Sequence, residues 1–377
     1  MTTSFDFDRV IDRRGGDSQK WNKYAGRDVL PLWVADMDFA APPAVVEALE
    51  RRVAHRVFGY GKPTPGLVDA AIGYLERRYG WRIEPEWLVW LPGLVTGLNA
   101  ACRAVDGDAL TALPVYPPFL SAPRLAGRKL ATAPLVLSGD AWEWDFACME
   151  AALTPATRLL LLCHPHNPVG RAWRPGELSR LADFCRRHDL TVCSDEIHCD
   201  LILDADRPHI PLAALDADMA RRAITLMAPS KTYNIPGLAC SLAVIPDASL
   251  RGRFSAVMRG IVPDVNVLGL AAAEAAFREC DDWREALLGV LRANRDRVET
   301  AIAGMAGVSM THVEATYLAW IDARALGVAD PARFFEEAGV GLSDGADFGA
   351  PGWVRLNFGC PRETLEAALK RMASACA

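Results

Sequence analysis

The feature that most constrains the fold of this chain is a series of short apolar runs between residues 94 and 246. The segment 177–188, which separates two of these runs, carries apolar residues at helical spacing. Near-continuous apolar strands separated by helices are typical of a mostly parallel sheet with helices on both faces. The sequence therefore predicts an α/β fold built on such a sheet. The predicted strands are Ala109–Leu113, Ala133–Leu137, Arg158–Cys163, Leu190–Ser194, Ala223–Met227 and Cys240–Ile245.

The pattern changes in the last third of the chain, where helical periodicity dominates up to about residue 303. Two isolated apolar strands follow, at 317–321 and 353–358, and a last helix starts at Glu363. This mixture predicts a second, smaller α+β domain. The amphipathic stretch 44–57 is expected to form a helix. The expected domains are residues 1–46 as a segment that joins the smaller domain, 47–267 as the large domain and 268–377 as the small C-terminal domain.

Composition excludes several classes of protein. Of the 377 residues, 51% are hydrophobic and 23% are charged, which is typical of globular proteins and excludes disordered or coiled-coil chains. The net charge is −6 without long runs of either sign, so neither nucleic-acid nor membrane-surface binding is expected. No apolar stretch reaches the roughly 18 residues of a membrane span, and the N-terminus is polar. We therefore expect a cytoplasmic protein.

Ten cysteines are scattered along the chain without any Cys-x-x-Cys pair. In a long chain without a signal peptide, free thiols in a reducing compartment are expected rather than disulfides. Cys185, Cys193 and Cys199 lie close together in sequence but lack the spacing of zinc ligands, so no metal site is predicted.

Three polar residues, Asn167, Asp195 and Lys231, each follow the end of one apolar run. In an open parallel sheet, ligands bind beyond the carboxyl ends of the strands. Each residue alone could be structural, as a loop asparagine, a helix-capping aspartate or a solvated lysine, but the three together favour one shared site. Lysine is also scarce, because only six of the 41 basic residues are lysines, and Lys231 is the only one between positions 130 and 369.

An amine, a carboxylate and an amide at one cleft suit pyridoxal 5′-phosphate (PLP). This cofactor needs a lysine amine for its covalent attachment and an aspartate that keeps its ring nitrogen protonated, so that the ring can accept electrons. It also needs a hydrogen-bond donor to its phenolate oxygen and backbone amides for its phosphate. The sequence therefore indicates a PLP site.

Several motifs resemble those of PLP enzymes of fold type I, which have the aspartate-aminotransferase-like fold. Within this class I/II aminotransferase superfamily, the chain is most similar to the cystathionine β-lyases (C–S lyases) of the MalY/PatB type, over nearly its whole length. The resemblance implies a large domain with a mostly parallel sheet between helices and a smaller α+β domain. The motifs that carry it are His166-Asn167-Pro168-Val169-Gly170, Asp195-Glu196-Ile197-His198, Ser230–Gly237, Val354–Phe358, Leu32–Phe39, Phe58–Gly61 and Pro114–Phe119.

The resemblance implies a role for each residue of the predicted PLP site. Lys231 attaches the cofactor and acts as the base at the substrate α-carbon. Asp195 pairs with the ring nitrogen, where a buried carboxylate next to a cation stays ionised. Asn167 donates to the phenolate oxygen, and His198 stands where related aminotransferases carry a tyrosine aimed at that oxygen. Tyr116 stacks on the ring, but for Tyr116 and His198 a purely structural role stays open.

A phosphate site is implied as well. Gly93, Leu94 and Val95 lead into an apolar helix, and backbone amides at a helix N-terminus bind phosphate. Ser230 adds a hydroxyl to this site. Many superfamily members have a serine or threonine three residues before the lysine, and here Ala228 stands at that position, which puts one phosphate contact in doubt.

The resemblance assigns one further residue to assembly and one to the substrate. Tyr60 is implied to reach the cofactor phosphate of a neighbouring subunit, so a homodimer with shared active sites is expected, with a turn tyrosine as the alternative. Arg355 lies in an apolar strand, where an unpaired guanidinium is costly. Its fork suits the α-carboxylate of a substrate, and a buried salt bridge is the alternative. The backbone of Ala35 completes this carboxylate site, and Tyr116 and Asn167 adjoin it.

These assignments predict a PLP-dependent C–S β-lyase that cleaves cystathionine or a related S-substituted L-cysteine to a thiol, ammonia and pyruvate. A PLP-dependent aminotransferase on the same scaffold is the first alternative, because both reactions begin with removal of the α-proton. A non-catalytic regulatory or binding protein is the second, and the intact lysine, aspartate and arginine argue against it. A DNA-binding form needs a basic helix-turn-helix head, for which residues 1–46 are too short. No motif identifies the leaving thiol.

Overall fold

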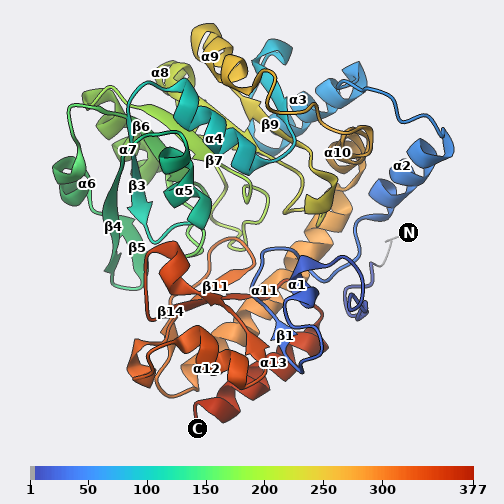
Figure 1. The fold of residues 1–377 in the computed structure, drawn as a ribbon, viewed down its shortest axis with the longest axis vertical. Helices are drawn as coiled ribbons and strands as arrows, with labels where there is room; N and C mark the ends of the chain where they lie inside the picture. Colours follow the sequence, from blue (N-terminus) through green and yellow to red (C-terminus); the bar gives the residue numbers. More distant parts are fainter. Residues whose placement is uncertain (1–4) are drawn as a thin grey trace.

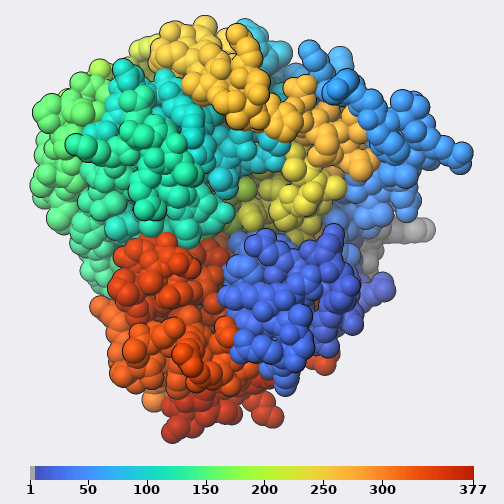
Figure 2. Space-filling model, viewed as in Figure 1, coloured from blue at the N-terminus to red at the C-terminus, as the bar shows by residue number. Residues whose placement is uncertain are grey.

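An eight-stranded sheet between layers of helices forms the larger part of the molecule, and a smaller sheet with its own helices packs below it (Figure 1). The computed structural model describes residues 5–377. In Figure 2 the N-terminal segment, in blue, and the C-terminal third, in orange and red, lie side by side along one edge of the larger part.

The large sheet confirms the predicted α/β fold, since all six predicted strands belong to it. Its strands β8, β7, β6, β3 and β4 run parallel, whereas β2, β9 and β5 are antiparallel to their neighbours. No α-helix separates β8 from β9, so the chain makes no crossover and β9 returns antiparallel. From edge to edge the order is β2 (Leu88–Leu91), β9 (Ser241–Val244), β8 (Ala223–Met227), β7 (Thr191–Asp195), β6 (Thr157–Cys163), β3 (Asp108–Leu113), β4 (Leu130–Ser138) and β5 (Ala141–Trp144).

Helices bury both faces of the parallel strands. In β6, Leu159 and Leu161 pack into a core cluster with α4, α5 and α9, whereas Leu160 and Leu162 pack into a second cluster with α7. Because side chains alternate along a strand, an apolar run without polar interruptions is needed when both faces are covered. The helices of this part are α2 (Pro43–Ala54), α3 (Pro65–Tyr79), α4 (Leu94–Ala104), α5 (Pro117–Leu125), α6 (Phe146–Ala152), α7 (Pro175–Arg187), α8 (Ala217–Arg222) and α9 (Ala248–Met258).

The smaller part is built around a four-stranded antiparallel sheet in the order β10 (Ser309–Met310), β11 (Leu318–Asp322), β14 (Trp353–Asn357) and β13 (Ser343–Asp344). The N-terminal segment contributes α1 (Gln19–Asn22) and β1 (Leu30–Pro31), which pairs with β12 (Val340–Gly341). The helices α12 (Pro331–Glu337) and α13 (Arg362–Ala375) complete this part. Short 3₁₀ helices are η1 (Pro85–Trp87), η2 (Leu212–Ala214), η3 (Pro236–Leu238), η4 (Arg324–Leu326) and η5 (Gly345–Phe348).

The long helical stretch predicted up to residue 303 consists of two helices, α10 (Val267–Glu279) and α11 (Asp281–Ala303). They meet at Cys280, whose backbone departs from helical angles at φ −111° and ψ 17°. Helix α10 packs against α2 and α3, so it lies with the large sheet. The domain boundaries stay a prediction, and this packing places the change from one part to the other near the α10–α11 junction.

Each of the ten cysteines is free in the structure. Among residues 5–377 no three histidine, cysteine or acidic side chains come together as a metal site would require. Within the same range no helix combines the length and the apolar character of a membrane span.

Candidate active site

The carboxyl ends of the parallel strands border a cavity of about 210 Å³. It lies where the large sheet meets the smaller part and the N-terminal segment, along the seam that Figure 2 shows. The structure brings together every predicted site residue except Tyr60. The cavity is lined by Ala35, Gly93, Leu94, Val95, Tyr116, Asn167, Asp195, His198, Ser230, Lys231 and Arg355, among others.

Asp195 is the last residue of β7, and its side chain is buried. One carboxylate oxygen accepts a hydrogen bond from the backbone N–H of Ile197 at 3.2 Å. No basic side chain of the described residues lies within 4.0 Å of this carboxylate. Burial raises the pKa of Asp195 to about 7, although the Ile197 hydrogen bond and the charge of Lys231 oppose the shift. Asp195 is therefore a buried carboxylate that lacks a cation.

Lys231 follows β8, and its amine donates a hydrogen bond to the carbonyl oxygen of Ala35. Burial lowers the pKa of this amine to about 8. The carboxylates of Asp36 and Asp195 act in the opposite direction, and the positive charge of Arg355 adds to the lowering. A base with a pKa near neutrality can both take and return a proton under ordinary conditions.

The segment that offers the Ala35 carbonyl is fixed from two sides. Asn234, three residues after Lys231, accepts from the backbone N–H of Met37 at 2.9 Å and donates to the carbonyls of Met37 and Phe39. On the other side the fully buried amine of Lys20 pairs with Asp38 at 2.7 Å. Sequence analysis missed both clamps. The scarcity of lysine was a signal for Lys20, since an apolar-looking neighbourhood gives no other hint of its burial.

Arg355 lies in β14, and only 4% of its surface is exposed. Its guanidinium donates to the side-chain oxygen of Asn167 at 2.9 Å, to the carbonyl of Trp33 at 2.9 Å and to the hydroxyl of Ser343 at 3.3 Å. Its Nε atom is buried without a partner among the described residues. Burial lowers its pKa to about 10.

The buried salt bridge, the alternative for Arg355, is absent from the described part of the chain, where no carboxylate lies within 4.0 Å of its guanidinium. The acceptors that hold the guanidinium are all neutral, and the ring of Phe348 lies 4.7 Å from it. The positive charge is thus positioned but not neutralised, which suits capture of a carboxylate.

The residues assigned to the cofactor ring surround the same cavity. His198 is buried, and its Nδ1 atom has no hydrogen-bond partner among the described residues. Burial lowers the pKa of His198 to about 3, so the ring is neutral at physiological pH. The Asn167 side chain uses its oxygen on Arg355, which leaves its amide nitrogen as a donor. Tyr116 precedes α5, and its backbone N–H donates to the Asn167 carbonyl at 3.1 Å.

The residues assigned to phosphate lie at the other wall. Gly93 is the N-cap of α4, and no side chain caps this helix. Its first backbone N–H groups therefore face the cavity beside Ser230. Ala228 is buried in the core cluster that α4 forms with the sheet, so its side chain belongs to packing.

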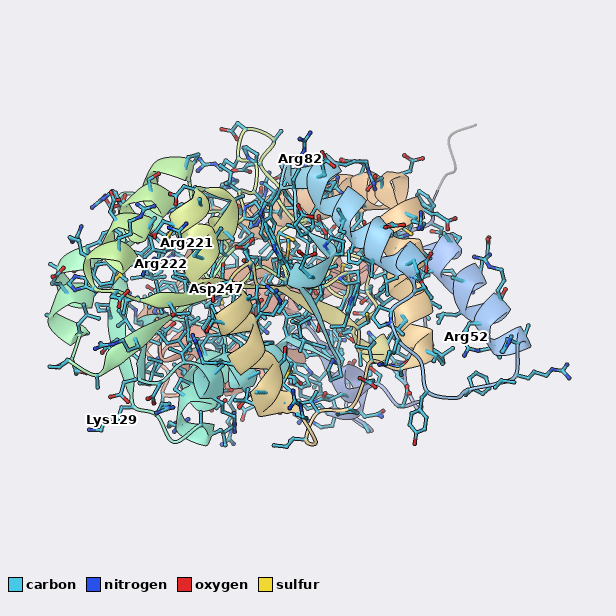
Figure 3. All side chains as sticks on the ribbon, turned by 90° about the horizontal axis from the view of Figure 1, so that it is seen from above. Arg52, Arg82, Lys129, Arg221, Arg222 and Asp247 are labelled. Carbon is cyan, nitrogen blue, oxygen red and sulfur yellow. The ribbon has the colours of Figure 1, made fainter. Side chains whose placement is uncertain are left out.

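Tyr60 lies apart from this cavity. It belongs to the segment between α2 and α3 and is fully exposed, together with Val57 and Phe58, whose exposed fractions are 61% and 56%. Helix α2, marked by Arg52 near its end in Figure 3, lies at one end of the molecule. Its role in assembly stays a prediction.

Comparisons with known proteins agree with this site. A family model described as "Aminotransferase class I and II" matches residues 27–372. The chain is 38% identical to the cystathionine beta-lyase PatB of Bacillus subtilis, over 98% of this chain and 99% of that protein. A crystal structure titled OvoB covers 99% of both chains at 52% identity, with a TM-score of 0.97. Cystalysin from Treponema denticola, whose structure contains pyridoxal 5′-phosphate, has 31% identity and a TM-score of 0.94 over 99% of this chain and 98% of that chain.

The lowered pKa of Lys231 predicts its reactivity when nothing is bound to it. At pH 7 an amine with a pKa of about 8 is about one-tenth unprotonated, against roughly one in 2,500 for an ordinary lysine. Limiting acetic anhydride should therefore label Lys231 first, and the pH midpoint of labelling, measured by peptide mass spectrometry, should lie near 8. In Asp36→Asn the midpoint should fall further, because a carboxylate that raises the pKa is removed. A midpoint near that of Lys129 would contradict the assignment.

Proposed function

This chain belongs to the class I and II aminotransferase family, and on that premise we propose that it is a PLP-dependent C–S β-lyase. It cleaves cystathionine or a related S-substituted L-cysteine to a thiol, ammonia and pyruvate. The observation that carries this proposal is the cavity in which Asp195, Lys231 and Arg355 meet as buried charges without ion-pair partners. A lone carboxylate, a lone amine and a lone guanidinium are what the cofactor and an amino-acid substrate need.

The residues present fit PLP. The Asp195 carboxylate lacks a cation, and a protonated ring nitrogen supplies one, which returns the pKa of Asp195 toward its ordinary value. The unpaired Nδ1 of His198 and the amide of Asn167 suit the ring oxygen. The uncapped N-terminus of α4 suits the phosphate. When bound, PLP supplies an electron sink that stabilises negative charge at the substrate α-carbon.

The chain's own residues bind and orient the substrate and move its protons. Arg355 binds the α-carboxylate, because its neutral hydrogen-bond partners fix the plane of the fork without neutralising it. This contact brings the α-carbon near Lys231, whose amine takes the α-proton. The Ala35 carbonyl and the Asp36 carboxylate then stabilise the ammonium that forms. The same ammonium can return its proton to the departing thiolate, which completes the elimination.

The reaction is tested by incubating the purified holoenzyme with L-cystathionine alone. We expect pyruvate and thiol to accumulate over many turnovers without any keto acid, because elimination restores the enzyme without an amino acceptor. An aminotransferase would instead need an acceptor keto acid and would stop after one turnover in its absence. Lys231→Ala should abolish turnover, and borohydride reduction with peptide mapping should place the pyridoxyl group on Lys231. A label on Lys62 or Lys129 would overturn the site.

The α-carboxylate assignment predicts the behaviour of Arg355→Lys. Lysine keeps the positive charge but loses the planar fork, so kcat/KM should fall about a hundredfold, mainly through KM. The absorbance of the bound cofactor should persist, because Arg355 is assigned to the substrate. Arg324→Lys, at an exposed arginine outside the cavity, is the matched control and should leave the kinetics unchanged. Loss of the cofactor with unchanged KM would show that Arg355 serves the cofactor instead.

The protein is further proposed to be a homodimer in which Tyr60 reaches the phosphate site of the partner subunit. Its full exposure beside Val57 and Phe58 supports this, because a second copy would bury an apolar surface there. The experiment mixes Tyr60→Ala with Lys231→Ala subunits at limiting PLP. If Tyr60 acts across the interface, the mixed dimer has one intact site and activity returns. If Tyr60 serves its own subunit, or if light scattering shows only a 41.0 kDa monomer, the shared site is excluded.

A further inference from the structure

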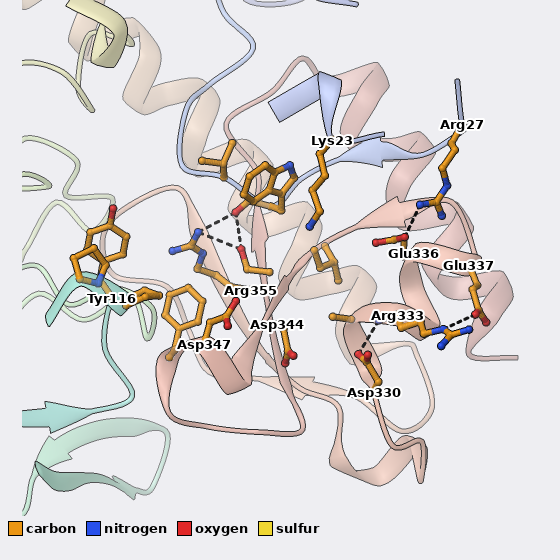
Figure 4. A pocket seen from close by; sticks show the side chains of 18 residues that line it. Lys23, Arg27, Tyr116, Asp330, Arg333, Glu336, Glu337, Asp344, Asp347 and Arg355 are labelled. Carbon is orange, nitrogen blue, oxygen red and sulfur yellow. Dashed lines mark hydrogen bonds and ion pairs between the residues drawn. The ribbon is translucent and has the colours of Figure 1, made fainter. Parts of the chain in front are cut away.

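A second and larger cleft, of about 840 Å³, adjoins the cofactor cavity. The two share three wall residues, Val34, Tyr116 and Arg355. The larger cleft runs from Arg355 outward between the N-terminal segment and helix α12, as Figure 4 shows. A substrate whose α-carboxylate lies at Arg355 therefore has open space for its β-substituent on the side away from the large sheet.

The outer end of this cleft is closed by paired charges. Arg27 donates to Glu336 at 2.6 Å, and Arg333 donates to Glu337 at 2.9 Å. These four side chains neutralise one another, so they offer little attraction to a bound molecule. Asp330 caps helix α12 by accepting from the backbone N–H of Arg333.

The part of the cleft nearer to Arg355 carries charges that are not paired. Lys23 has no carboxylate within 4.0 Å in the described chain, and its amine lies 4.6 Å from the ring of Trp33. Asp347 makes no hydrogen bond or ion pair with the described residues, and Asp344 uses one oxygen on the backbone N–H of Ala346. In Figure 4 Lys23 enters from the N-terminal segment, and the two aspartates enter from the opposite side.

Arg355 supplies the independent observation that this space receives a ligand. It is buried, yet its Nε is unpaired and its charge is not neutralised, and it forms part of both walls. A ligand anchored there meets an unpaired cation on one side and unpaired carboxylates on the other. Opposite charges arranged in this way match a zwitterion.

We propose that this cleft is the leaving-group subsite and that the leaving thiol carries an amino-acid head group. Asp344 and Asp347 contact its ammonium, and Lys23 contacts its carboxylate. The inference rests on the proposed lyase function and adds to it the class of the leaving group. Neither the size of the smaller cavity nor the Arg355 contact selects this class, so the selectivity belongs to Lys23 and the two aspartates.

The expected selectivity is moderate, because these charges are partly or fully exposed. Exposed charge pairs contribute little each, so every lost contact should change kcat/KM by about threefold to tenfold. Salt should weaken the preference, since the screening length falls from about 10 Å at 0.1 M to about 3 Å at 1 M.

The test uses the holoenzyme and substrates that share one reacting centre and differ in the charge of the leaving group. L-cystathionine carries both charges, S-(2-aminoethyl)-L-cysteine only the ammonium, S-(2-carboxyethyl)-L-cysteine only the carboxylate, and S-propyl-L-cysteine neither. The measured quantity is kcat/KM for each charged substrate divided by that for S-propyl-L-cysteine. In the wild-type enzyme this ratio should be largest for L-cystathionine and should fall at 1 M salt.

Two variants separate the charges. Asp347→Asn should lower the ratio for the aminoethyl substrate threefold to tenfold and leave the ratio for the carboxyethyl substrate unchanged. Lys23→Met should have the reverse effect. The matched controls, Asp140→Asn and Lys129→Met, change the same charges outside the cleft and should leave both ratios unchanged.

The outcomes distinguish this inference from the proposed function. If the substrates are cleaved but neither cleft variant changes its ratio, the subsite inference is overturned and the lyase assignment stands. If both controls change the ratios as much as the cleft variants do, the effect is one of net charge and the inference is overturned as well. If the wild-type enzyme cleaves none of the substrates, the lyase function itself is wrong and the inference fails with it.

Discussion

The arrangement of this molecule depends on keeping three ionisable groups out of water without an ion-pair partner. Burial moves the pKa of Asp195 up to about 7 and that of Lys231 down to about 8. At roughly 1.4 kcal/mol per pKa unit, each shift corresponds to a cost on the order of 3 kcal/mol in protein without cofactor. The cost for Asp195 grows as the pH rises from about 4 to 7, because the folded state then binds the extra proton. The cost for Lys231 is relieved as the pH rises from about 8 to 10.5, because the unfolded chain then binds the extra proton.

The fold supports these charges with backbone carbonyls and neutral side chains that come from distant parts of the sequence. The Asn357 side chain donates to the carbonyls of Val34 and Asp36 at 2.6 and 2.7 Å, and Asn234 binds the next residues of the same segment. The N-terminal segment is therefore held between β14 of the smaller part and the loop that carries Lys231. This connection sets the position of the Ala35 carbonyl against the lysine amine, so the small part and the large sheet both determine the site.

The sheet and the residues at its strand ends could be predicted because both depend on local patterns. An apolar run shows that a strand is buried on both faces, and the polar residue after it marks the edge where ligands bind. The direction of β9 could not be read from such a run, because apolarity carries no direction. The break at Cys280 was missed since helical periodicity continues across it. The leaving-group cleft was beyond reach, because Lys23 and Asp347 meet only through the tertiary fold and follow no sequence period.

The position of Arg355 between the two cavities bears on which reaction the site favours. Its guanidinium fixes the amino-acid end of a substrate at the boundary, so the cofactor lies on one side and the β-substituent on the other. A thiol released into the outer cleft can leave to solvent without passing the cofactor, and water can enter by the same route. An elimination needs both, since the thiol must depart and water must release ammonia and pyruvate. An aminotransferase needs neither, because its two substrates bind in turn and share one pocket. An open cleft with unpaired charges beside a fixed carboxylate anchor therefore favours elimination over transfer.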